Sequence, residues 1–107
     1  MAEAKAVTTA TFQKDVLDVP GVSVVDFWAP WCGYCVRMMP IFEELEGGMS
    51  DKVNFAKVNT DEEIDLAKQY EIDVLPTFLV LKDGQVVDRK IGYMPLAELK
   101  AVIEAHL

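Results

Sequence analysis

The two cysteines of this sequence, Cys32 and Cys35, carry its most reactive side chains. They are the only cysteines among 107 residues. In the first turn of a helix, unpaired backbone N–H groups and the positive end of the helix dipole favour a thiolate over a thiol. Side chains three positions apart on a helix lie on one face, about 5–6 Å apart, within the range that a disulfide bridges. The pair is therefore suited to closing and opening a disulfide with little backbone movement.

A strand and a helix are expected to position this pair. The run Val22–Trp28 is apolar and β-branched, which predicts a buried strand, and Ala29-Pro30 ends it. From the cysteines onward, the apolar spacing predicts a helix that stops at Gly47-Gly48. Pro40 removes one backbone hydrogen bond of that helix, so we expect a kink there.

The remaining elements are expected to alternate along the chain. Short apolar runs predict further strands at residues 4–7, 53–59, 77–81 and 85–89. One helix is expected to follow Thr8 or Thr9, with Phe12, Val16 and Leu17 on one face. Another is expected to open at a capping-box pattern over residues 60–63 and to run through residue 70, and a closing helix is expected to start at Pro95.

This order of elements predicts an α/β domain over residues 1–107. Strands that alternate with helices favour parallel pairing, with helices on both faces of the sheet. Asp83-Gly84 is a preferred tight turn, so the last two strands are expected to form an antiparallel hairpin. We therefore expect a central mixed five-stranded sheet flanked by four helices, in the order β-α-β-α-β-α-β-β-α.

Length and charge exclude several classes of function. A chain of 107 residues buries roughly 60–70% of its surface on folding, so it needs no metal or disulfide for stability. A net charge of −8 disfavours nucleic acids and anionic membranes as partners. No apolar run approaches the about 18 residues of a membrane span, and Met1–Lys5 lacks the order of a signal peptide. We expect a cytoplasmic protein, where such a cysteine pair is catalytic or metal-binding more often than structural.

Motifs along the whole chain resemble the thioredoxin family. They are the run Asp26–Cys35 with its Cys32-Gly33-x-Cys35 core, Pro40, Lys57-Val58-Asn59, Pro76-Thr77, Asp83-Gly84 and Gly92. The resemblance implies the thioredoxin fold and a protein dithiol–disulfide oxidoreductase, an enzyme that reduces disulfides of substrate proteins through a mixed disulfide. It further implies a thioredoxin reductase as partner and no cofactor or metal, and we expect a monomer.

The resemblance also implies roles for individual residues. Cys32 is expected to attack the substrate disulfide, and Cys35 to resolve the mixed disulfide. A carboxylate in an apolar strand must pair or take a raised pKa, which suits Asp26 to deprotonate Cys35. Lys57 is expected in the neighbouring parallel strand, where it would pair with Asp26 and restrain that shift.

A substrate groove is expected beside the cysteines. The resemblance assigns it to Trp31, Gly33, Tyr34, Leu75, Pro76, Gly92 and Tyr93. It implies a cis bond before Pro76, which would turn the backbone of Leu75 outward to pair with an extended substrate strand.

Two positions depart from the family pattern. Tyr34 stands where proline is usual, which restores a backbone N–H and relaxes φ, and both effects favour a less negative redox potential. Tyr93 and Met94 follow Gly92 where small residues are usual. Either these side chains join Tyr34 in a more aromatic groove rim, or Tyr93 points into solvent.

Three other functions are compatible with the cysteine pair. Tyr34 could make the protein a less reducing disulfide isomerase, an oxidant or a glutaredoxin-like exchanger. A non-enzymatic binding module would use the groove alone, and would keep its effect when both cysteines are replaced by serine. A zinc site would need ligands beyond two thiolates, and because the only histidine is His106 at the far terminus, it would require a dimer.

Overall fold

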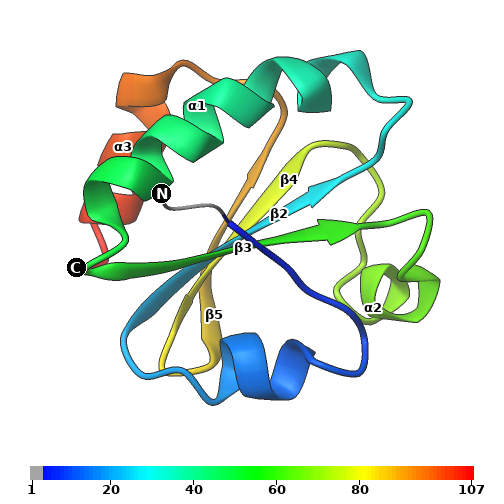
Figure 1. The fold of residues 1–107 in the computed structure, drawn as a ribbon, viewed down its shortest axis with the longest axis horizontal. Helices are drawn as coiled ribbons and strands as arrows, with labels where there is room; N and C mark the ends of the chain where they lie inside the picture. The colour runs from blue at the N-terminus through cyan, green and yellow to red at the C-terminus, as the bar shows by residue number, and fades with distance from the viewer. Residues whose placement is uncertain (1–3) are drawn as a thin grey trace.

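A mixed five-stranded sheet runs through the middle of the molecule, in a computed structural model that describes residues 4–107. The strands are β1 (Lys5–Ala6), β2 (Val22–Trp28), β3 (Val53–Asn59), β4 (Thr77–Lys82) and β5 (Gln85–Ile91). The helices are η1 (Gln13–Leu17, a short π-helix), α1 (Gly33–Met49), α2 (Ile64–Gln69) and α3 (Leu96–Glu104). Figure 1 shows α1 and α3 on one face of the sheet, and α2 and the blue helical turn η1 on the other.

The strand order is β1-β3-β2-β4-β5. β3 pairs in parallel with both β1 and β2, whereas β4 is antiparallel to β2 and to β5. Asp83 and Gly84 join β4 to β5 with φ angles of 50° and 81°, which fits the predicted tight turn. The thioredoxin fold, its mixed sheet and the order of its elements are therefore confirmed.

The central strand β2 separates two apolar cores. Successive side chains of a strand point to opposite faces. Val24 packs with Met38 of α1 and Leu99 of α3, whereas Val25 packs with Val16 of η1 on the other face. Burial on both faces explains why this strand is a continuous apolar run rather than an alternating one.

The end of α1 differs from the sequence prediction. The helix continues through Gly47 and Gly48 to Met49. Leu45 and Met49 are buried in the core that α1 shares with α3, and this packing extends the helix beyond the two glycines. Pro40 lies inside the helix, as expected.

The predicted starts of two shorter helices are also corrected. The capping box at residues 60–63 does not form, because Thr60 donates its hydroxyl to the carbonyl of Trp28 and the Glu63 carboxylate accepts from Thr9. Helix α2 therefore starts only at Ile64. Thr8 accepts a hydrogen bond from the N–H of Thr11, so it caps a turn that leads into η1 rather than an α-helix.

The close approach of the hairpin turn to η1 generates a stability prediction. A Cβ added at Gly84 would lie 2.5 Å from the carbonyl oxygen of Leu17, on a backbone with positive φ. We expect Gly84→Ala to lower the free energy of unfolding by about 2 kcal/mol or more, measured by urea denaturation.

Gly47→Ala is the matched control for this substitution. Gly47 is exposed inside α1, with open space where the methyl group would lie. This variant should be more stable than the parent by about 0.5–1 kcal/mol. Equal stability of the two alanine variants would contradict the packing of the turn against η1.

Candidate functional site

The two cysteines form a disulfide at the N-terminus of α1. Their Cα atoms are 5.2 Å apart. Cys32 is the N-cap of the helix, and the backbone N–H of Cys35 donates to Cys32 Sγ at 3.2 Å. An amide donor in this position favours a thiolate on Cys32 once the disulfide opens. Cys35 is fully buried and Cys32 retains 7% exposure, so Cys32 is the cysteine that another molecule can reach.

Asp26 is a buried acid on β2, directly beside Lys57 of β3 in the strand register. Its Oδ1 atom is buried, and no residue of the described chain hydrogen-bonds to it. Burial raises the pKa of Asp26 to about 7, and the positive charge of Lys57 partly opposes this shift. The expected raised pKa and the restraining effect of Lys57 are both present, although residues 4–107 hold no direct ion pair between the two side chains.

A cavity of about 80 Å³ adjoins the Asp26 carboxyl group. Its lining residues come from β2, β3, α1 and the start of the chain: Ala4, Asp26, Trp28, Met39, Phe42, Glu43 and Lys57. The cavity has room for water, which needs about 10–15 Å³ of such space. Two charged residues besides Asp26 line this cavity, and of these Glu43 is exposed and Lys57 half-buried.

Loops distant in sequence meet the disulfide. The peptide bond between Leu75 and Pro76 is cis, which confirms that prediction. Leu75 packs against the buried cluster that contains both cysteines. The N–H of Gly92, which has a φ of 96°, donates to the carbonyl of Pro76 at 2.8 Å. The structure therefore brings the predicted groove loops to the cysteines.

Exposed apolar side chains occupy these loops and the start of α1. They are Trp31, Tyr34, Val36, Val74, Ile91 and Tyr93. Trp31 is 71% exposed, and its indole N–H donates to Asp61 Oδ1 at 3.0 Å. Sequence reasoning missed Asp61 because it lies within the apparent capping box. It missed Val36, Val74 and Ile91 because apolar residues are expected in the buried core from the sequence alone, whereas these three side chains are exposed.

Met94 does not join the groove rim. It is buried in the core between α1 and α3, and its N–H donates to Met38 Sδ at 3.4 Å. Tyr93 is 47% exposed, so consecutive residues of this turn point to opposite environments. The alternative of a rim with both side chains is therefore wrong for Met94.

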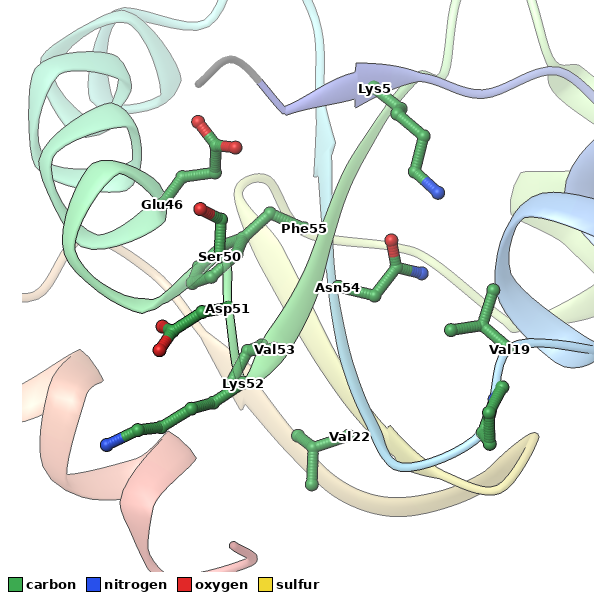
Figure 2. Close-up of a pocket in the computed structure, with 11 residues that line it drawn as sticks. Lys5, Val19, Val22, Glu46, Ser50, Asp51, Lys52, Val53, Asn54 and Phe55 are labelled. Carbon is green, nitrogen blue, oxygen red and sulfur yellow. The ribbon is translucent and has the colours of Figure 1, made fainter. Parts of the chain in front are cut away.

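A wider cavity of about 350 Å³ lies at the opposite end of the sheet, where β2 and β3 begin. Figure 2 shows Lys5 of β1, Glu46 of α1 and Asn54 of β3 around it. Its lining holds charged groups of both signs and neither cysteine. The redox chemistry therefore belongs to the other end of the sheet.

The described residues also bear on metal and membrane functions. Between residues 4 and 107, no group of three or more His, Cys, Asp or Glu side chains is placed to hold a metal ion. His106 lies beside Asp88, with Nε2 and Oδ2 3.0 Å apart, rather than near the cysteines. None of the helices in this part of the chain is long and apolar enough to cross a lipid bilayer.

Comparisons with known proteins agree with this site. The family model described as Thioredoxin matches residues 3–105. The chain is 45% identical to thioredoxin 1 of Synechococcus elongatus over the full length of both chains. It is 44% identical to thioredoxin of Rhodospirillum rubrum, over 96% of this chain and 99% of the relative. The crystal structure of Malassezia sympodialis thioredoxin matches with a TM-score of 0.88 and 35% identity, covering 99% of this chain and 92% of that one.

These matches and the site lead to the same conclusion. The family match spans nearly the whole chain, and the Cys32–Cys35 disulfide lies at the start of α1. The chain therefore belongs to the thioredoxin family and is a protein dithiol–disulfide oxidoreductase.

Proposed function

We propose that Cys32 is the attacking thiolate and Cys35 the resolving thiol of this oxidoreductase. The observation that carries this assignment is the difference in burial, since Cys32 is partly accessible and Cys35 is not. The Cys32 thiolate attacks one sulfur of a substrate disulfide, forming a mixed disulfide and releasing a substrate thiolate. Cys35 then attacks Cys32 Sγ, which closes the Cys32–Cys35 disulfide and releases the second substrate thiolate. Two electrons have then passed to the substrate.

Asp26 is the base that takes the proton from Cys35 before the second attack. A base works best when its pKa lies near the working pH, and burial places the pKa of Asp26 at about 7. The unpartnered Oδ1 and the adjoining cavity support this role, because the proton can leave toward solvent. Lys57 is a positioning residue that keeps this pKa from rising further.

The substrate binds across the loops beside Cys32. An extended substrate segment pairs with the outward backbone of Leu75, as a strand added to a sheet edge does. The other groove residues line its path: Trp31, Gly33, Tyr34, Pro76, Gly92 and Tyr93. Pro76 is buried, but Trp31, Tyr34 and Tyr93 expose apolar surface, which supports contact with another protein chain.

The partners and setting follow from the same family relationship. A thioredoxin reductase returns Cys32 and Cys35 to the dithiol form, and disulfide-containing proteins are the substrates. The chain acts as a single-domain monomer in the cytoplasm, where thiols are kept reduced. A net charge of −8 disfavours nucleic acids and anionic membranes as partners.

Trapping of the mixed disulfide tests the roles of the two cysteines. Cys35→Ser, reduced and then mixed with a disulfide-bonded protein such as insulin, should accumulate a covalent adduct through Cys32. Cys32→Ser should form little adduct, because its remaining thiol is buried. Non-reducing electrophoresis and intact mass measure the yields. Equal yields from the two variants would contradict the assignment.

The raised pKa of Asp26 predicts how stability depends on pH. The pKa of Asp26 is 3.8 in the unfolded chain and about 7 in the folded protein. At pH values between these two, Asp26 holds a proton in the folded protein that it has lost in the unfolded chain. Unfolding therefore becomes easier as the pH rises through this window. Asp26→Asn should abolish this decrease of stability with pH. Its free energy of unfolding should exceed that of the parent by about 2–4 kcal/mol at pH 8 and differ little at pH 4. Urea denaturation at several pH values measures both.

The same variant tests the role of Asp26 as a base. Release of substrate from a preformed mixed disulfide should slow by about 10-fold or more at neutral pH. Asp51→Asn, at an exposed position beyond the far end of α1, is the control and should release substrate at the parent rate. Unchanged release by Asp26→Asn from pH 6 to 8 would rule out the proton transfer.

A further inference from the structure

Tyr34 and Arg37 form an exposed pair directly beside the disulfide. The guanidinium carbon of Arg37 lies 5.7 Å from the centroid of the Tyr34 ring, within the range of a cation–π contact. The two residues are three positions apart on α1, so they share one face of the helix. Tyr34 stands inside the cysteine motif itself, so Arg37 contacts a residue of that motif.

Arg37 has donors to offer a ligand. Among residues 4–107, both ion pairs involve Asp88, and no carboxylate pairs with Arg37. Stacking uses the flat face of a guanidinium and leaves the N–H groups at its edge available. What distinguishes Arg37 from the other cations without an ion pair is its contact with the ring of Tyr34 inside the cysteine motif.

A hollow accompanies the pair. It has a volume of about 220 Å³ and is lined by Gly33, Tyr34 and Arg37. Trp31 lies on the other side of Cys32 in the sequence. Its indole N–H donates to Asp61, which places a negative charge beside Trp31. The two flanks of the cysteine motif therefore carry opposite charges.

We propose that this hollow binds the carboxylate of an aspartate or glutamate that flanks the substrate disulfide. This subsite rests on the proposed function, in which Cys32 attacks that disulfide. The edge of the Arg37 guanidinium matches a carboxylate in a two-point hydrogen bond. The ring of Tyr34 holds the guanidinium in place, which reduces the entropy lost on binding. Proline at position 34 would supply no such ring.

The overall negative charge of the protein does not cancel this attraction. Glu43 and Glu44 are the first acids after Arg37 on α1, and six residues of helix separate Arg37 from Glu43 by about 9 Å along the axis. Exposed charges at such a distance are largely screened, since the Debye length is about 8 Å at physiological salt. For a carboxylate in direct contact with Arg37, attraction to the guanidinium therefore outweighs repulsion by Glu43 and Glu44.

Two peptides that differ in one side chain test the subsite. Each contains one disulfide, flanked by glutamate in the first peptide and by glutamine in the second. At physiological ionic strength, the reduced protein should reduce the glutamate peptide about 3–10-fold faster in kcat/KM. Arg37→Gln should remove this preference through KM and leave the glutamine peptide within about twofold. Lys100→Gln, an exposed cation on α3, should keep the preference.

The ring has its own pair of variants. Tyr34→Phe should retain the preference for the glutamate peptide, and Tyr34→Leu should lower it, because only phenylalanine keeps the stacking face. Equal rates of the parent on both peptides, or an equal loss on both in Arg37→Gln, would overturn the subsite. Failure of the parent to reduce either peptide would overturn the proposed function, and the subsite with it.

Discussion

The fixed position of the central strand β2 is the constraint on which the site depends. β2 is hydrogen-bonded to β3 on one edge and to β4 on the other, and apolar cores cover both of its faces. Its end is therefore held rigidly, and the short turn after it starts α1 at the cysteines. The strand order also explains how the loops of the proposed groove come together. β4 and β5 lie next to β2 in succession, so the loops at Pro76 and Gly92 reach the same end of the sheet.

The same rigid strand carries a group that opposes folding at neutral pH. Asp26 could be replaced by an apolar residue with a gain in packing, because burial of an ionised carboxylate is costly. The proposed proton transfer from Cys35 gives a reason for the presence of Asp26 on β2, beside Lys57 and a small cavity. A buried group that lowers stability in this way is expected where stability and function conflict.

Sequence reasoning reached the fold and the cysteine chemistry because these depend on local patterns. The strand at 22–28 is a largely apolar run that ends before Ala29-Pro30, the strand at 53–59 places apolar residues among polar ones, and both match the structure. It failed where distant contacts decide: burial of Met49 extends α1, and Thr9 draws Glu63 away from the capping box. Met94 and the contact of Arg37 with Tyr34 were missed for the same reason, since side-chain direction is set by packing.

The midpoint potential of the Cys32–Cys35 couple tests the central claim most directly. The protein would be equilibrated in defined thiol buffers, free thiols alkylated, and the mass shift measured. A protein that reduces substrate disulfides despite Tyr34 should have a potential more negative than about −230 mV, toward the value of about −270 mV found for thioredoxin. A potential of about −230 mV or higher would contradict the account and place the protein among glutaredoxin-like or isomerase-like exchangers.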